Sequence, residues 1–207
     1  MPVMTKDGRA VLFIHVPKAG GTTIEQLFVK SGWTMHFRST NRLQPDLFPF
    51  LRISPQHYHA ALLSELFKVS KFDLVFAMLR EPVARFRSEF AMRNRTLDAA
   101  PADVVSAWAD KQLARYADNP SILDNHLRPQ SEFLLPGTER YRLEDGMEAM
   151  VADLNERFDA GLGSDTRHRM SSEKRGLPSS SVEVSAELRS RLADFYGRDF
   201  AELGYDA

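Results

Sequence analysis

The sequence contains no cysteine among its 207 residues. Disulfides, thiol nucleophiles and cysteine-ligated zinc sites are therefore excluded. It also has no excess of positive charge, because 27 Lys and Arg side chains stand against 28 Asp and Glu side chains and leave a net charge of −1. For this reason we expect no broad electrostatic binding of nucleic acid.

Long apolar runs are missing as well. No stretch approaches membrane-spanning length, and the first ten residues, MPVMTKDGRA, contain no signal-peptide core. We therefore expect a cytoplasmic protein that does not insert into membranes. Hydrophobic residues make up 43% and charged residues 27% of the chain, which is typical of a globular protein. The length fits one domain over residues 1–207.

Apolar strands alternate with amphipathic helices along the chain. Residues 11–14 and 72–79 are almost entirely apolar, as in strands buried on both faces of a sheet. Helical patterns follow both strands, and further helices are predicted over 102–116, 147–158 and 185–203. This order predicts an α/β fold, a P-loop-like three-layer α/β/α arrangement with a mostly parallel sheet. Ligands of such sheets bind where strands end, so the turns after the first two strands are the expected site.

The turn after the first strand reads PKAGGT, residues 17–22. A strand, a Gly-rich turn and a helix in this order favour phosphate binding, because backbone N–H groups converge at the helix N-terminus. Lys18 adds a positive charge, and Thr22 and Thr23 add hydroxyl donors. The lysine precedes the glycines, whereas a nucleoside triphosphatase loop has its lysine after them. An ordinary turn with a chance lysine is the alternative interpretation.

The second strand is followed by Arg80, and the helix predicted over 82–95 carries Ser88. A guanidinium group offers a planar fork for phosphate oxygens. A magnesium-dependent nucleotide site would instead need an acidic residue at the end of such a strand. The two turns therefore predict an anion site without a metal. Alternatively, Arg80 is a surface arginine paired with Glu81 or Glu89, and Ser88 is a small residue where the helix crosses the sheet.

Two histidines, His57 and His59, stand in a turn before a helix predicted over 60–69. Histidine suits a general base because its pKa lies near neutral pH. Surface turn residues or helix caps are the alternative, and no further ligands stand at a spacing that would predict a metal site. His15, at the end of the first strand, is predicted to support the fold or the site rather than to react.

The segments HVPKAGGTT and LREPVARFRSEF resemble the two cofactor signatures of sulfotransferases that use 3′-phosphoadenosine 5′-phosphosulfate (PAPS). More narrowly, they resemble carbohydrate sulfotransferases of the heparan sulfate 2-O-sulfotransferase type. The resemblance implies that Arg80 and Ser88 bind the 3′-phosphate. It also implies that one of His57 and His59 is the catalytic base, and we favour His59. The loop implied to hold the 5′-phosphosulfate consists of Lys18, Ala19, Gly20, Gly21, Thr22 and Thr23.

The same resemblance implies a metal-free, in-line transfer of a sulfuryl group from PAPS to an acceptor hydroxyl, with Lys18 acting on the leaving phosphate. A basic Ser-rich loop containing Arg169 and Lys174 is expected to contact the nucleotide, and a solvated loop is the alternative. Residues 126–130, HLRPQ, either line the acceptor cleft or form a rigid turn. The acceptor is expected to be a saccharide or a small metabolite.

Two other functions remain open at this point. One is a non-catalytic module of the same fold that binds a nucleotide or a glycan. The other is a P-loop kinase, which would need magnesium. The sequence does not predict the oligomeric state.

Overall fold

The computed structural model describes residues 2–38, 46–164 and 176–206. The predicted nucleotide contacts Arg169 and Lys174 lie outside these described residues. Two compact units make up the chain. Unit 1 contains the described parts of Met1–Leu79 and Glu132–Arg169. Unit 2 contains the described parts of Arg80–Ser131 and Met170–Ala207. A single domain over 1–207 stays a prediction.

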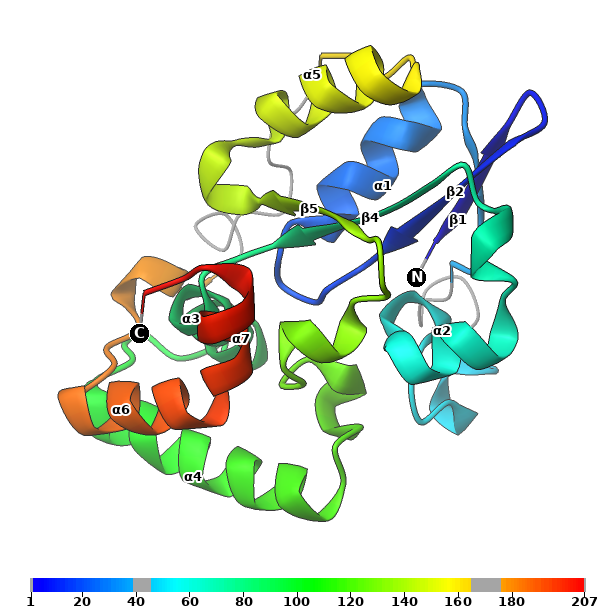
Figure 1. Cartoon of the computed structure of the whole chain (residues 1–207). Helices are drawn as coiled ribbons and strands as arrows, with labels where there is room; N and C mark the ends of the chain where they lie inside the picture. The colour runs from blue at the N-terminus through cyan, green and yellow to red at the C-terminus, as the bar shows by residue number, and fades with distance from the viewer. Residues whose placement is uncertain (1, 39–45, 165–175, 207) are drawn as a thin grey trace. The chain divides into compact units, whose positions relative to one another are not determined.

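A five-stranded mixed sheet lies in unit 1 (Figure 1). Its strands are β1 (Val3–Lys6), β2 (Arg9–Ile14), β3 (Thr34–His36), β4 (Leu74–Leu79) and β5 (Glu139–Arg142). They are arranged in the order β3-β1-β2-β4-β5. The β2–β4 and β4–β5 pairs are parallel, whereas β1 pairs antiparallel with both β2 and β3. The predicted α/β fold is confirmed, but the sheet is mixed rather than mostly parallel.

The antiparallel part of the sheet begins with a hairpin that the sequence interpretation did not include. Asp7 and Gly8 join β1 to β2, and both have a positive φ, of 50° and 79°. Lys6 pairs with Arg9, so the loop contains two residues. Two-residue loops favour primed turns, in which both central residues can have positive φ, and Asp-Gly is a preferred sequence for them. This dipeptide between two apolar segments is the signal that predicts the hairpin.

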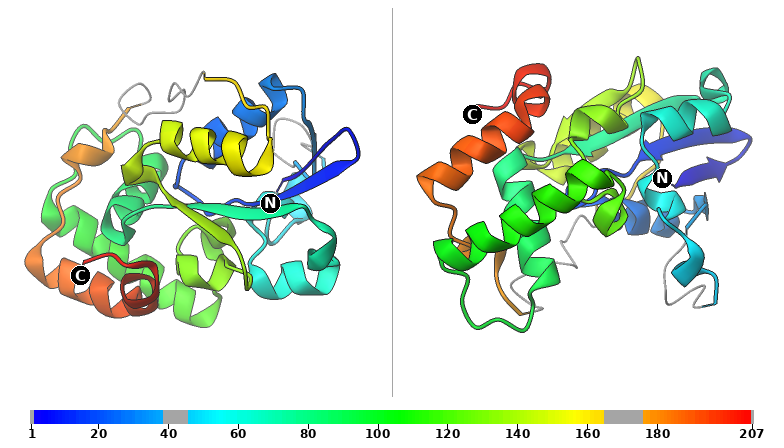
Figure 2. Two further views of the ribbon diagram at one scale, coloured as in Figure 1. Left: turned by 45° about the horizontal axis from the view of Figure 1, so that its top comes forward. Right: turned by 90° about the horizontal axis from the view of Figure 1, so that it is seen from below.

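Three α-helices belong to unit 1: α1 (Gly21–Lys30), α2 (Ala60–Leu66) and α5 (Met147–Phe158). Helices α1 and α5 lie on the same face of the sheet (Figures 1 and 2). Under α1, the rings of Phe13 and Phe28 stack on Phe76 of β4, with centroids 4.9 and 5.7 Å away. All three rings are fully buried. This apolar layer fixes α1 on the sheet, and with it the turn that joins β2 to α1.

Unit 2 is helical, with α3 (Pro82–Arg93), α4 (Ala102–Asp118), α6 (Ala186–Phe195) and α7 (Gly197–Leu203). Its core contains Phe86, Phe90 and Leu188, all nearly inaccessible to solvent. The prediction of a single helix over 185–203 is wrong, because α6 ends at Phe195 and a second helix, α7, begins at Gly197. Glycine follows the break, and it is a poor helix former.

Candidate functional site

The turn between β2 and α1 has an unusual backbone. Lys18 has a φ of 68° and Gly20 one of 84°, while Ala19 between them is not in the left-handed region. Backbone of alternating hand turns successive N–H groups toward one side and forms an anion-binding concavity. Positive φ is strained for a residue with a side chain, and such strain is concentrated at functional sites. The sign of φ at Lys18 and Gly20 is compatible with a phosphate loop, which stays a prediction.

The two glycines of the turn are favoured for different reasons. A Cβ at Gly21 would lie 2.3 Å from Nε2 of His15, so close packing requires a glycine there. Gly20 has a φ of 84°, a conformation that residues with a side chain rarely adopt. In the first turn of α1, Oγ1 of Thr23 is buried and has no hydrogen-bond partner among the described residues. An unpaired buried hydroxyl beside a helix N-terminus fits an anionic oxygen.

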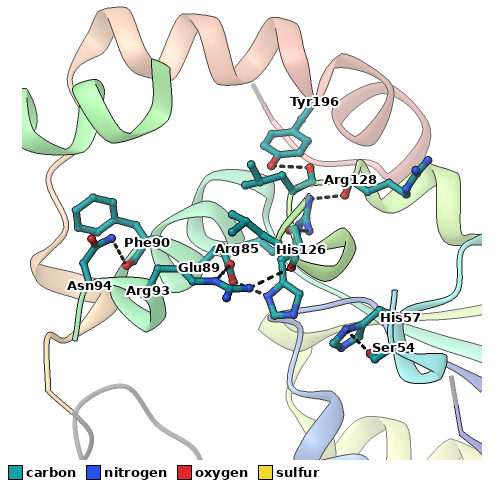
Figure 3. A network of polar contacts seen from close by, with 12 residues as sticks. Ser54, His57, Arg85, Glu89, Phe90, Arg93, Asn94, His126, Arg128 and Tyr196 are labelled. Atoms are coloured by element: carbon teal, nitrogen blue, oxygen red, sulfur yellow. Dashed lines mark hydrogen bonds and ion pairs between the residues drawn. The ribbon is translucent and has the colours of Figure 1, made fainter. Parts of the chain in front are cut away.

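The two predicted histidines lie in one turn of unit 1. His57 ends a short 3-10 helix, and His59 is the N-cap residue of α2. Oγ of Ser54 lies 3.2 Å from Nδ1 of His57 (Figure 3). The ring of His57 also meets the ring of His15 edge-on, with centroids 5.0 Å apart. Within the described part of the chain, the His59 side chain makes no capping hydrogen bond to α2, so helix capping does not explain it.

A buried glutamate that the sequence analysis did not single out lies behind this loop. Glu25 is 2% exposed, and its Oε1 lies 2.6 Å from Nδ1 of His15. Nε2 of Gln56 donates to the same carboxylate, at 3.0 Å from Oε1 and 3.3 Å from Oε2. Burial alone would raise the pKa of Glu25, but the charge of His15 and the hydrogen bonds from His15 and Gln56 outweigh it and lower the pKa to about 2. Glu25 is therefore ionised at neutral pH.

A signal for this residue was present in the sequence. Glu25 stands between the apolar residues Ile24 and Leu27, on a helix whose buried residues include both. It lies one turn after Gly21, and residues four apart share a helix face. An acidic side chain on the apolar face of a helix needs a partner, because a buried charge without one is costly.

Arg80 is the first residue of unit 2 and follows β4 directly. The side chain of Gln130 hydrogen-bonds to both the N–H and the carbonyl group of Arg80. The N–H of Arg80 donates to Oε1 of Gln130 over 3.0 Å, and Nε2 of Gln130 donates to the carbonyl of Arg80 over 2.7 Å. Gln130 is fully buried, and its own N–H donates to Asp199. Ser88 is partly buried on α3.

Arg85, which belongs to the same motif as Arg80, has a structural role. It is 1% exposed and donates to the carbonyls of His126 and Arg128, over 2.9 and 2.8 Å (Figure 3). Its guanidinium lies over the ring of Tyr196, 5.0 Å from the centroid. These contacts hold residues 126–128 on α3 and support the rigid-turn interpretation of that segment. A contact with the acceptor there stays a prediction.

Glu89, on the same helix, is fully buried. Its Oε2 lies 2.6 Å from Nδ1 of His126, and Nε of Arg93 donates to its Oε1 over 2.7 Å (Figure 3). Burial raises the pKa of Glu89, but the nearby His126 and Arg93 outweigh it and lower the pKa to about 2. Unit 2 thus contains a buried Glu–His pair, as unit 1 does with Glu25 and His15.

The sequence matches the model of a family described as the Sulfotransferase family over residues 1–206. No curated protein and no protein of known structure matches it in the corresponding comparisons. The match includes both motifs, the Lys18 turn and the Arg80 segment. In the described ranges, no helix is both long enough and apolar enough to span a membrane.

Proposed function

Because the chain belongs to the sulfotransferase family and is therefore a PAPS-dependent sulfotransferase, we propose that it sulfates a hydroxyl group. We propose a saccharide or a small metabolite as the acceptor that carries this hydroxyl. When bound, PAPS supplies a sulfuryl group attached to a phosphate leaving group. Sulfuryl transfer rests on the family match over nearly the whole chain, joined to a strained lysine turn at a helix N-terminus. The proposed class of acceptor rests on the resemblance of the two motifs to carbohydrate sulfotransferases.

We assign the 5′-phosphosulfate to the turn between β2 and α1. The alternating backbone from Lys18 to Gly20 and the unpaired hydroxyl of Thr23 support this assignment. The Lys18 ammonium would stabilise negative charge on the leaving phosphate, which is how preorganised positive groups lower the barrier of group transfer. The lysine supplies the charge that a metal supplies in phosphoryl transfer, so we propose metal-free chemistry. The full set is Lys18, Ala19, Gly20, Gly21, Thr22 and Thr23.

We assign the 3′-phosphate to Arg80 and Ser88. The bidentate contact with Gln130 fixes the main chain of Arg80 and limits the positions open to its guanidinium. The guanidinium of an arginine can bind two phosphate oxygens at once. Arg169 and Lys174 are proposed as further nucleotide contacts.

The proposed base is His59 or His57. A histidine near the acceptor would take the hydroxyl proton as the acceptor oxygen attacks sulfur. The resemblance favours His59, whereas the contacts with Ser54 and His15 orient the ring of His57. Both residues remain candidates, and variants of each separate them.

The finer classification is also a proposal. Motif sequences support an enzyme of the heparan sulfate 2-O-sulfotransferase type acting on carbohydrate. The parallel strands β2 and β4, each followed by a helix, support a P-loop-like three-layer arrangement. A cytoplasmic location, expected from the sequence, stays a proposal.

Nucleotide binding gives the first test. We expect 3′-phosphoadenosine 5′-phosphate (PAP) to raise the melting temperature without magnesium, because the Arg80 segment would recognise its 3′-phosphate. ATP with magnesium is the matched comparison and should have little effect. Stabilisation by ATP with magnesium alone would contradict the proposal and favour a P-loop kinase. PAP binding with no turnover of PAPS against a panel of saccharides would instead favour a non-catalytic binding module.

A further inference from the structure

Glu25 connects two segments of unit 1 that carry proposed reactive side chains. It contacts His15, which precedes the Lys18 turn, and Gln56, which precedes His57 in the chain. We propose that Glu25 and Gln56 are positioning residues that hold the histidine turn at a fixed place relative to the phosphate loop. The inference rests on the proposed function, because it takes the base to be His57 or His59.

On the side of the loop, the imidazole of His15 is held on two edges. Its Nδ1 lies 2.6 Å from Glu25. Its Nε2, Cδ2 and Cε1 atoms all lie within 2.6 Å of the position that a Cβ on Gly21 would occupy. The ring therefore lies against Gly21 and Glu25, which stand one turn apart on the same face of α1, and it links Glu25 to the backbone that follows Lys18.

On the side of the histidines, Gln56 anchors the turn to the same carboxylate. Its side-chain nitrogen donates to both oxygens of Glu25 across 31 positions of sequence. Gln56 and Ser54 are both buried although they stand in a connecting segment. The N–H of His57 donates to the carbonyl of Ser54 over 2.9 Å, which closes the turn. Hydrogen bonds to a charged acceptor are stronger than neutral ones, so the anchor is firm.

A second contact defines the direction of the turn. The ring of His57 packs edge-on against His15, the other partner of Glu25. Consecutive residues of the turn thus make two different contacts, Gln56 with Glu25 and His57 with His15, and together these restrict both its position and its rotation. A base must stand within hydrogen-bond reach of the acceptor, and a displacement of about 1 Å can lower the rate by about 10²-fold.

The variant Gln56→Ala tests this role, since it removes the anchor and leaves the Glu25–His15 pair in place. We expect turnover of PAPS to PAP, with water or a saccharide as acceptor, to fall by about 10- to 10²-fold. The affinity for PAP, measured by calorimetry, should stay within about twofold of wild type. The matched control is Gln112→Ala, which removes a buried glutamine of α4 in unit 2 and should not change turnover.

Wild-type turnover in Gln56→Ala would overturn the inference, and so would equal losses of turnover and PAP affinity. Gln56→Met keeps the side-chain volume, and it should show the same loss of turnover if the alanine variant does not fold. A readout independent of activity is the NMR spectrum of ¹³C-labelled histidine. We expect the signals of His57 and His15 to shift in either variant while the signal of His126 does not.

These results separate the inference from the proposed function. If wild type neither binds PAP nor turns over PAPS, the proposed function fails. If wild type is active and the His57 and His15 signals are unchanged in the folded Gln56 variants, the positioning role fails.

Discussion

At the scale of single residues, Lys18 combines an unusual backbone conformation with its proposed chemical role. Its φ of 68° is unusual for a residue with a side chain and costs on the order of 1 kcal/mol or more. Burial of the neighbouring residues Val16 and Ala19 holds the turn in this conformation. The strain is maintained by packing around the turn, as expected where function requires a particular backbone.

The histidine pair gives a prediction at the same scale. We expect His59→Ala to lower sulfuryl transfer by about 10²- to 10⁴-fold, the usual contribution of a general base. The affinity for PAP should be unchanged, because the histidines are not proposed to touch the nucleotide. Single-turnover kinetics with PAPS and binding isotherms with PAP measure the two effects.

His57→Ala is the paired variant for this test. If His59 is the base, His57→Ala should have the smaller effect, through loss of the contacts with Ser54 and His15. A larger loss in His57→Ala would assign the base to His57. Full turnover in both variants would remove the pair from the mechanism.

At the scale of elements, the start of α1 depends on a glycine. Helix propensity predicts that alanine at Gly21 would stabilise the helix by somewhat less than 1 kcal/mol. The structure predicts the opposite, because the new Cβ would lie 2.3 Å from the ring of His15. We expect Gly21→Ala to lower the free energy of unfolding by about 1–3 kcal/mol, as overpacking does, in urea titrations.

Gly197→Ala provides the control, since Gly197 also stands at the first position of a helix, α7. A Cβ there would meet nothing within 4 Å. This variant should be neutral or more stable by less than about 1 kcal/mol. Equal effects of the two substitutions would contradict the packing argument.

At the scale of the whole molecule, stability should depend on pH through one buried glutamate in each unit. The pKa of Glu25 and that of Glu89 are both lowered from 4.5 to about 2. A group with a lowered pKa stabilises the fold above its unfolded-state pKa, and this stabilisation is lost as pH falls through the folded-state value. The free energy of unfolding should therefore fall from about pH 4.5 toward pH 2.

A shift of this size corresponds to about 3 kcal/mol for each buried glutamate. Urea titrations at several pH values should show a flatter pH dependence for Glu89→Gln than for wild type, because that variant has lost the contribution of Glu89. Glu187→Gln is the control: Glu187 is exposed, and solvent screening should leave its effect small. An unchanged slope in Glu89→Gln would contradict the lowered pKa.

The local elements that position the proposed site follow from the sequence. The apolar strand, the Gly-rich turn and the helix pattern predicted β2, the turn and α1, and the limits 147–158 of α5 are those observed. Such features depend on side-chain periodicity and on glycine, which act over a few neighbouring residues. The Asp7-Gly8 hairpin belongs to this class too, although the sequence interpretation missed it.

The contacts that hold the site were decided only by the tertiary structure. Gln56 meets Glu25 across 31 positions, and Gln130 meets Arg80 across 50. Single polar side chains at such separations leave no periodic pattern, because their partners are set by how the elements pack. The sequence by itself therefore determined the residue types of the two motifs, on which the proposed chemistry depends. The fold determined which buried groups hold each motif in place, since hydrogen bonds between distant residues exist only after the apolar core has formed.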